Sequence, residues 1–297
     1  MKHILIIGSA NADYVIHTER LPKLGETLPG HNFSVNIGGK GLNQAIAVQK
    51  LGGKACFLGA VGHDMNGAML LKAMADQKVS FHGICSDKET TGIALITVVQ
   101  GNNCILLHPG ANSCITSDVI REKKELIENA AAAIFQLEIP SEAVLAGIRM
   151  ANAANVPVYL NPAPARDLPE DIYGLIDYLI PNEHEAAALS GVEAETEEGC
   201  RQNIRFFREE GVKNVIITRG EMGCAYHEGN DIHFCPAVKT TPVDTTSAGD
   251  TFIGAFSVQT LSGKNIHEAV HYACRAAAIT VSRPGAAASI PTAEEIE

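Results

Sequence analysis

Short apolar runs and helical segments alternate regularly from residue 116 onward. The expected strands are 132–138, 156–160, 178–180 and 214–218, and the expected helices are 118–128, 141–154, 183–190, 196–210, 249–261 and 266–281. Ser141 is the expected N-cap of the second of these helices. Each crossover helix returns the chain to the end of the sheet where the previous strand began, so the next strand runs parallel to it. The alternation therefore predicts an α/β fold with a mostly parallel sheet and helices on both faces.

The N-terminal third departs from this order. Two strands, at 14–18 and 27–37, are expected directly after strand 2–8 and a loop at 8–13, before any helix. Two strands without a helix between them indicate a separate small sheet, and a hairpin of 92–99 and 103–107 around residues 100–102 is its expected second half. The other elements expected in this part are helix 38–51, strand 55–61, helix 66–77 and strand 79–85.

The charge balance restricts the partners of this chain. Lys and Arg total 23 and Asp and Glu total 34, so the net charge is −11. A nucleic-acid partner is therefore not expected, because no basic surface outweighs repulsion from its phosphates. The length of 297 residues and the hydrophobic fraction of 46% suit a folded protein with a substantial core.

The N-terminus and the cysteines indicate the compartment. Only four strongly apolar residues, 4–7, follow the first three, which is too short for a signal peptide, and no run is long enough to span a membrane. The eight cysteines include no Cys-x-x-Cys pair and fit a reducing environment, where most would be small core residues. We therefore expect a cytoplasmic protein without a membrane partner.

Polar residues gather after the strands of the expected sheet. Ligands of parallel α/β sheets bind outside the carboxyl ends of the strands. One edge of the sheet is therefore the expected ligand site. The polar residues at this edge are Asn11 and Asp13 after the first strand, Glu138, Asn161 and Asn182 after the next three, and residues 218–220.

Residues 244–250 read Asp-Thr-Thr-Ser-Ala-Gly-Asp and precede apolar residues that suit a helix, which is expected to begin at about Ala248 or Gly249. The free N–H groups of a helix start bind anions, and Gly249 would let a phosphate approach the backbone. Asp250 is then placed to take a proton from a hydroxyl that attacks a phosphoryl group. The alternative is that Asp244 is only an N-cap and Asp250 only a first-turn acid.

Three other motifs are absent or incomplete. The glycine-rich segment 38–41 has no Ser or Thr after its lysine, so it is not a P-loop, and it lacks the third glycine of a dinucleotide site. The pattern His-Glu-x-x-His at 267–271 matches zinc proteases, but positions 274 and 277 are Cys and Ala instead of the further Gly and His of the longer motif. We interpret it as a solvated helix face.

Seven short motifs follow one another along the chain. They are Gly-Ser-Ala-Asn-Ala-Asp at 8–13, Gly-Gly-Lys-Gly-Leu-Asn-Gln-Ala at 38–45, Gln-Leu-Glu at 136–138, Asn-Pro-Ala-Pro-Ala at 161–165, Pro-Asn-Glu-His-Glu at 181–185, Ile-Thr-Arg-Gly at 217–220 and the segment 244–252. In type and order they resemble the motifs of the PfkB-type (ribokinase-like) carbohydrate kinases. The resemblance extends from residue 8 to about residue 290.

The resemblance implies one α/β domain over residues 1–297, with three α/β/α layers, a mostly parallel sheet and a small β-sheet lid built from about 11–38 and 91–107. It implies transfer of the γ-phosphoryl group of ATP to a sugar, and within the family to the 5-hydroxyl of D-ribose, which gives ribose 5-phosphate. It also implies Mg²⁺ with ATP, a monovalent cation, in the first place K⁺, and a homodimer joined through the lids.

The resemblance also implies roles for individual residues. Asp250 is the implied catalytic base, and the amides of Ser247, Ala248 and Gly249 are the implied anion hole. The implied sugar contacts are Asn11, Asp13, Gly39, Lys40, Asn43, Glu138 and Asp250, and the implied nucleotide contacts are Asn182, Thr218, Gly220, Gly223, Gly249 and Cys274. Glu185 is implied to hold Mg²⁺ largely through water, and a K⁺ site is implied at Asp244, Thr246, Thr280, Arg283, Gly285 and Ser289, several through backbone carbonyls.

Simpler roles stay open for four of these polar residues. Lys40 could be a solvated cation at a helix start, and Glu138 a cap on a neighbouring helix. Glu185 could be an ordinary first-turn acid and Asn161 part of a turn. The functional alternatives are the same phosphoryl transfer to deoxyribose, another sugar or a nucleoside, a non-catalytic sugar- or nucleotide-responsive binding protein, and a zinc hydrolase.

Overall fold

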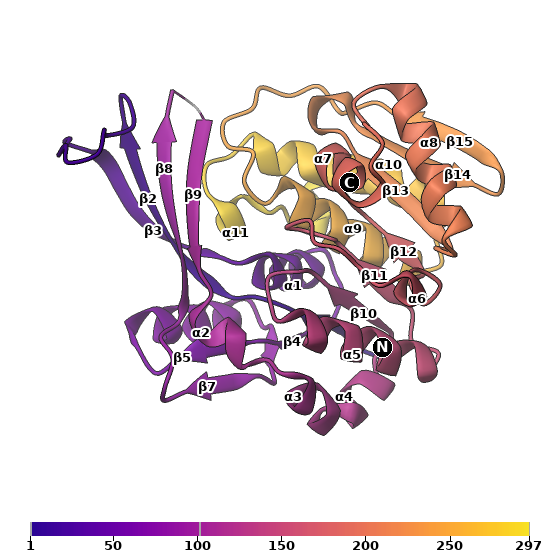
Figure 1. The fold of residues 1–297 in the computed structure, drawn as a ribbon, viewed down its shortest axis with the longest axis horizontal. Helices are drawn as coiled ribbons and strands as arrows, with labels where there is room; N and C mark the ends of the chain where they lie inside the picture. The colour runs from indigo at the N-terminus through magenta and orange to yellow at the C-terminus, as the bar shows by residue number, and fades with distance from the viewer. Residues whose placement is uncertain (1, 101, 297) are drawn as a thin grey trace.

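The computed structural model describes residues 2–100 and 102–296 (Figure 1). Its main sheet has the strand order β15-β14-β13-β12-β11-β10-β1-β4-β6. Neighbours are parallel from β6 to β13, and β13, β14 and β15 pair antiparallel. The bounds are β1 Ile4–Ile7, β4 Ala55–Leu58, β6 Ser80–Phe81, β10 Ala132–Phe135, β11 Val158–Leu160, β12 Tyr178–Leu179, β13 Asn214–Thr218, β14 Cys224–Glu228 and β15 Asp231–Cys235.

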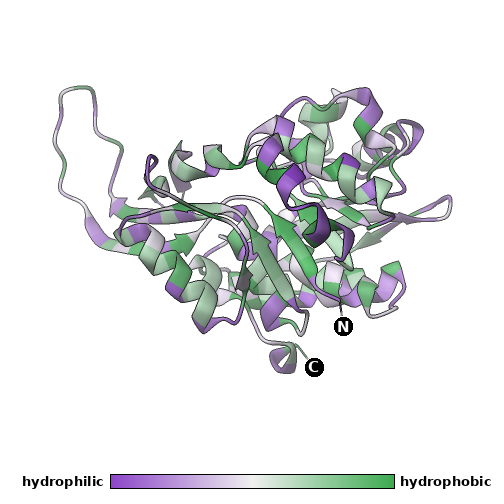
Figure 2. Cartoon of the chain, turned by 90° about the horizontal axis from the view of Figure 1, so that it is seen from below, coloured by the Kyte–Doolittle hydropathy of each residue, from purple (hydrophilic) through white to green (hydrophobic). Residues whose placement is uncertain are grey.

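Each face of this sheet carries its own hydrophobic core. Successive side chains of a strand point to opposite faces, so Ile4 and Ile6 of β1 belong to one core and Leu5 and Ile7 to the other. Figure 2 shows the central strands in the green of apolar residues. The first core packs on α1 Lys40–Lys50, α2 Met65–Asp76, α9 Ala248–Leu261 and α10 Ile266–Val281, and the second on α3 Ser117–Glu122, α4 Lys124–Glu128, α5 Ser141–Ala153, α6 Glu170–Tyr173, α7 Glu183–Ser190 and α8 Glu197–Glu209.

A second sheet of four strands, in the order β3-β2-β8-β9, leans away from this body at the left of Figure 1. Its strands are β2 Asn11–Thr18, β3 His31–Gly38, β8 Gly92–Val99 and β9 Asn102–His108. We call this sheet the lid. The expected fold class, a layered α/β fold with a mostly parallel sheet and a separate small sheet, is confirmed. That residues 1–297 form a single domain stays a prediction.

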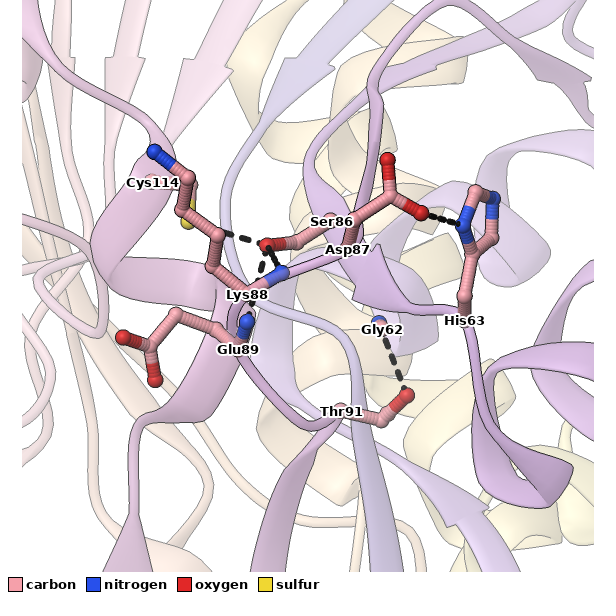
Figure 3. Close-up of polar contacts among 8 residues, drawn as sticks. All are labelled: Gly62, His63, Ser86, Asp87, Lys88, Glu89, Thr91 and Cys114. Atoms are coloured by element: carbon pink, nitrogen blue, oxygen red, sulfur yellow. Dashed lines mark hydrogen bonds and ion pairs between the residues drawn. The ribbon is translucent and has the colours of Figure 1, made fainter.

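Several hydrogen bonds fix the segment that leads into β8 (Figure 3). A two-stranded sheet of β5 Ala60–Gly62 and β7 Ile84–Ser86 precedes it. Ser86 Oγ accepts the N–H groups of Lys88 at 3.2 Å and Glu89 at 3.0 Å, and Thr91 Oγ1 accepts the Gly62 N–H at 2.9 Å. The lid strand β8 is therefore anchored to the body where it begins.

Several expected boundaries in the N-terminal half were wrong. Asn11 does not lie in a loop but begins β2, because it pairs with Gly38 of β3 and Gly92 of β8. The expected strands 55–61 and 79–85 each divide in two, since β4 and β6 belong to the main sheet and β5 and β7 to the two-stranded one. β3 begins at His31 rather than at 27. The expected turn at 100–102 includes Gly101, which lies outside the described residues.

Three corrections apply to the later part of the chain. The expected helix 118–128 divides at Lys123 into α3 and α4. Pro140 rather than Ser141 is the N-cap of α5, and Ser141 is its first helical residue. The tail expected to be irregular contains a short helix, α11 Ala286–Ser289, and a 3₁₀ turn, Ala293–Glu295.

Gly254 lets α9 pack closely on α1. A Cβ atom at Gly254 would lie 2.5 Å from Ala47 Cβ and 3.0 Å from the Val48 N atom. We expect Gly254→Ala to lower the free energy of unfolding by about 1–3 kcal/mol, because the two helices must move apart. Gly249→Ala is the control in the same helix, since a Cβ there meets no atom within 4 Å. Denaturant unfolding measures both, and a Gly254→Ala variant as stable as the control would contradict this packing.

Candidate active site

The chain turns sharply into α9, the helix that carries Asp250. Ser247 is the N-cap, with a φ of 62° in the left-handed region that residues with a side chain seldom adopt. The first N–H groups of α9 have no partner inside the helix. The expected helix start at Ala248 is confirmed. Asp244 is not the N-cap, because its carboxylate instead accepts the N–H of Thr246 at 2.9 Å.

Asp250 is held at the centre of a buried network of amide side chains. Only 7% of it is exposed. Its carboxylate accepts the Asn43 side-chain N–H at 3.2 Å and the Gln44 side-chain N–H at 2.9 Å. Gln44 also donates to Asn161 Oδ1 at 3.2 Å and accepts from Gln136 Nε2 at 2.6 Å. The network therefore joins the starts of α1 and α9 to the carboxyl ends of β10 and β11.

The charged groups around Asp250 act on one another. Burial raises the pKa of Asp250, while the Lys40 cation and the hydrogen bonds from Gln44 and Asn43 oppose that shift. Burial alone would lower the pKa of Lys40, but the carboxylates of Asp250, Glu138 and Glu185 outweigh it and the pKa is raised. A buried carboxylate with a raised pKa is a better proton acceptor than one in water.

Glu138 has two roles at this site. It accepts the backbone N–H of Lys40 at 3.1 Å and the Ser9 hydroxyl, so it does cap the start of α1. Its charge also contributes to the raised pKa values of Asp13 and Asp250. The capping role and a place beside the site therefore do not exclude each other.

Asp13, on the lid strand β2, is 7% exposed. Burial and the nearby charges of Glu138 and Asp250 raise its pKa from 3.8 to about 7. The folded protein favours protonated Asp13, so this contribution to stability is complete below about pH 4 and is lost as the pH rises to about 7.

We expect Asp13→Asn to be more stable than the wild type at pH 8, and the difference to shrink towards pH 4. Thermal unfolding between these pH values measures it, with the exposed Asp231→Asn as control. A pH-independent difference would contradict the raised pKa.

Buried polar atoms of the network lack partners. Among the described residues, four buried side-chain polar atoms have no hydrogen bond, and three belong here: Asn43 Oδ1, Gln136 Oε1 and Ser247 Oγ. Buried polar groups in folded proteins are almost always paired. Unpaired buried atoms on residues of one network indicate that a polar ligand binds there.

Four of the expected nucleotide contacts lie at or after the ends of β12 and β13, whereas Gly249 lies on α9 and Cys274 on α10. Asn182 forms a β-bridge with Thr218 and is the N-cap of α7, where it accepts the Glu185 N–H at 2.7 Å. The Glu185 carboxylate in turn accepts the Asn182 backbone N–H at 2.9 Å, so it also has the ordinary role of a first-turn acid. Gly220 and Gly223 have φ values of 48° and 87°, and a Cβ on Gly223 would lie 2.0 Å from the Cys235 carbonyl.

Hydrogen bonds connect only some of the residues that are expected to bind the cation. Asp244 links two segments, because besides the Thr246 N–H it accepts the Gly285 N–H at 3.1 Å. The Thr280 hydroxyl donates to Thr251 of α9 at 3.0 Å. Two other side chains point elsewhere: Ser289 Oγ donates to the Ala286 carbonyl at 2.8 Å, and the Arg283 guanidinium pairs with Glu295 at 2.6 Å.

The residues of the site that were missed in the sequence include Gln44 and Asn112. Gln44 has a recognisable signal, since it directly follows Asn43 in the motif at 38–45. Asn112 has none: it lies in the 3₁₀ turn Gly110–Cys114 and donates to Asn11 Oδ1 at 2.8 Å across 101 positions of chain. Lys40, Asn43 and Glu138 were predicted, and the structure brings them to Asp250.

The pattern His-Glu-x-x-His lies apart from this network, on α10. Glu268 forms a capping box with Asn265 at the start of the helix. His267 Nδ1 lies 2.5 Å from the Tyr226 hydroxyl. Glu268 therefore caps the start of α10, and His267, Glu268 and His271 are all exposed, as expected of a solvated helix face.

Comparison with known proteins gives consistent matches over the whole chain. The family model described as pfkB family carbohydrate kinase matches residues 1–293. Ribokinase of Haemophilus influenzae is 37% identical and covers 99% of this chain and 97% of its own length. The chain spans only 56% of a bifunctional ribokinase/ribose-5-phosphate isomerase A of Fructilactobacillus sanfranciscensis, which is 39% identical over 100% of this chain.

The fold is also that of solved ribokinases. Arabidopsis thaliana ribokinase, whose structure contains ribose and ATP, superposes with a TM-score of 0.91 at 32% identity and covers 99% of this chain and 97% of its own. Among the described residues, no helix is long and apolar enough to cross a membrane.

Proposed function

The chain belongs to the pfkB family of carbohydrate kinases, and we propose that it transfers the γ-phosphoryl group of ATP to the 5-hydroxyl of D-ribose, giving ribose 5-phosphate and ADP. The choice of ribose follows the ribokinases to which the chain is similar. The observation that carries the proposal is the network around Asp250, a buried carboxylate at a helix start, whose neighbouring residues include buried polar atoms without partners.

Asp250 is the proposed catalytic base. It accepts the proton of the 5-hydroxyl as the sugar oxygen attacks the γ-phosphorus, and ADP leaves. The amides of Ser247, Ala248 and Gly249 stabilise the charge on the phosphoryl oxygens, together with the positive end of α9. Ala248 N–H has only a long bond of 3.3 Å to the Thr245 carbonyl, which a phosphoryl oxygen can replace.

The proposed sugar contacts come from both the lid and the body. Asn11 and Asp13 lie on β2, and Lys40, Asn43 and Glu138 lie near the start of α1. Gly39 has a φ of 88°, and a Cβ there would lie 2.8 Å from the Asn11 N atom, so the glycine lets α1 begin directly beside β2. Several hydroxyls held by fixed polar groups would exclude sugars that lack one of them.

The proposed nucleotide contacts are Asn182, Thr218, Gly220, Gly223, Gly249 and Cys274. Glu185 would hold Mg²⁺ through water, and it fits because its carboxylate is close enough to Lys40 and Asp250 for their charges to act on its pKa. Bound Mg²⁺ neutralises charge on the phosphates of ATP.

A K⁺ site beside the anion hole is proposed at Asp244, Thr246, Thr280, Arg283, Gly285 and Ser289. The donors fit a hard cation, since they are a carboxylate, hydroxyls and backbone carbonyls. The hydrogen bonds of Asp244 to both Thr246 and Gly285 support the grouping of the two segments. Arg283 could contribute only its carbonyl, because its guanidinium pairs with Glu295.

A panel of acceptors tests the substrate. In a coupled ADP assay we expect the highest kcat/KM with D-ribose, and lower values with 2-deoxyribose, other pentoses, hexoses and nucleosides. Repeating the panel without K⁺ is expected to lower the rate. A higher kcat/KM with deoxyribose or a nucleoside would transfer the proposal to that acceptor, and an unchanged rate without K⁺ would remove the cation from it.

A homodimer joined through the lids is also proposed. The lid strands expose large apolar side chains, including Phe33 at 63% and Leu106 at 73%. Apolar side chains grouped on one exposed sheet suggest a surface that is covered by a partner. Leu106→Glu is expected to shift the mass measured by light scattering from dimer to monomer, and a wild type that is monomeric at assay concentration would contradict the dimer.

A cytoplasmic location is proposed from the eight free cysteines.

A further inference from the structure

Three cysteine side chains meet at one point outside the network around Asp250. Cys224 and Cys235 are paired residues of the antiparallel strands β14 and β15, so both side chains lie on the same face of the sheet. Cys274 reaches them from α10. Its Sγ lies 3.9 Å from Cys224 Sγ and 3.8 Å from Cys235 Sγ, and all three sulfurs lie within 4.8 Å of one another.

A histidine borders this cluster on its solvent side. His271 lies three residues before Cys274 on α10, so the two side chains share a helix face. Its Nδ1 and Nε2 atoms lie 3.6 and 3.9 Å from Cys235 Sγ. His271 is exposed, whereas the three cysteines are buried. An ion could therefore reach the sulfurs past the imidazole.

These separations match those between the ligands of one metal ion. A tetrahedral zinc with Zn–S bonds of about 2.3 Å and Zn–N bonds of about 2.0–2.1 Å separates two sulfurs by about 3.8 Å and a sulfur and a nitrogen by about 3.6 Å. Packing alone also brings sulfurs to such a distance, but packing does not require an imidazole directed at the same sulfur. Zinc sites with three cysteines and one histidine are an established ligand set.

We propose that Cys224, Cys235 and Cys274 bind a thiophilic metal ion, in the first place Zn²⁺, with His271 as the fourth ligand. The three sulfurs are already grouped. The His271 ring contacts only one of them, Cys235 Sγ, so its side chain must rotate to bring a nitrogen to the ion. His271 is preferred to His267 because the His271 ring contacts Cys235 Sγ, whereas the contact described for His267 Nδ1 is with the Tyr226 hydroxyl. Each coordinating thiol binds as a thiolate and releases its proton to solvent, and no electron is transferred.

The site adjoins the proposed nucleotide contacts. Cys224 directly follows Gly223, and Cys274 is itself one of those contacts. An ion held here would fix β14, β15 and α10 next to the nucleotide. Direct metal binding tests the proposal, so its result does not depend on the proposed kinase reaction.

The experiment uses the full chain, untagged, reduced and freed of metal. Titration with Co²⁺ is expected to give one equivalent of bound metal with an intense thiolate-to-cobalt charge-transfer band and the visible bands of tetrahedral Co²⁺. Zn²⁺ should displace the cobalt, and competition with a chromophoric chelator gives its affinity. A wild type that shows no stoichiometric thiolate band overturns the proposal without the need of any variant.

Matched variants identify the ligands. Cys235→Ser is expected to lower the Zn²⁺ affinity by at least the ~10–100-fold that loss of a supporting contact costs at metal sites. Cys200→Ser is the control, because Cys200 is also buried but lies in the core on the opposite face of the sheet. Equal affinities of Cys235→Ser and wild type would overturn the site. His271→Ala should change the visible cobalt bands, and an unchanged spectrum would exclude His271 as the fourth ligand.

Discussion

Asp250→Asn is expected to lower kcat by ~10²–10⁴-fold, the usual contribution of a general base. An amide of the same shape cannot take the proton of the sugar hydroxyl. The helix start and its N–H groups stay in place, so binding of ATP and ribose should change little. Because Asn43 and Gln44 both donate to Asp250, the new amide also leaves one of these donors facing another donor.

That local conflict makes a stability measurement part of the test. We expect thermal unfolding and calorimetric binding of ATP and ribose to show a folded variant that binds both. Asp171→Asn is the matched control, since Asp171 is exposed on α6 and pairs only with Arg149 among the contacts described for it. A kcat within a few-fold of the control would remove Asp250 from the role of base.

Gly249→Ala is expected to separate activity from stability. The added Cβ meets no protein atom within 4 Å, and alanine favours a helix over glycine, so the unfolding free energy should be unchanged or higher. The methyl group would occupy space next to the first amides of α9, where the phosphoryl oxygens are proposed to bind. Loss of one anion-hole donor costs about 10²–10³-fold in kcat, and we expect a loss approaching that range.

Gly254→Ala provides the opposite case in the same helix. It should lose stability through the contact with α1, with a smaller loss of kcat at a temperature where it is folded. Steady-state kinetics and denaturant unfolding of the two variants give four values that distinguish an anion site from a packing site. A Gly249→Ala variant with full activity would contradict the proposed approach of phosphate to the backbone.

The alternating part of the fold was predictable because strand and helix periods differ and each element is bounded by its own turn residues. Thus α7 ends at Gly191 in the left-handed conformation, as expected of a helix followed by glycine. The division of 55–61 was not predictable, because β4 and β5 pair with different partners and a single apolar run does not reveal this. Sheet membership is decided by contacts distant in sequence.

The residues of the candidate site also divide into those that local sequence reveals and those that only distant contacts bring together. Asp250 and Gly249 could be recognised, since a helix start with glycine and an acid has local chemistry. Lys40 and Glu138 needed the family resemblance to be linked, because they are 98 positions apart and joined by one hydrogen bond. Asn112 could not be recognised, since only the packing of the 3₁₀ turn Gly110–Cys114 against the start of β2 brings it to Asn11.

The passage from β1 to β2 limits how such an enzyme can be redesigned. Only three residues separate Ile7, in the middle of the body, from Asn11, the first residue of the lid. A chimera that takes its lid from a relative to change its sugar preference would therefore have its first junction within three residues of a strand that is packed in both cores. Small steps at Asn11 and Asp13 on the original scaffold are the more practicable route to a new acceptor.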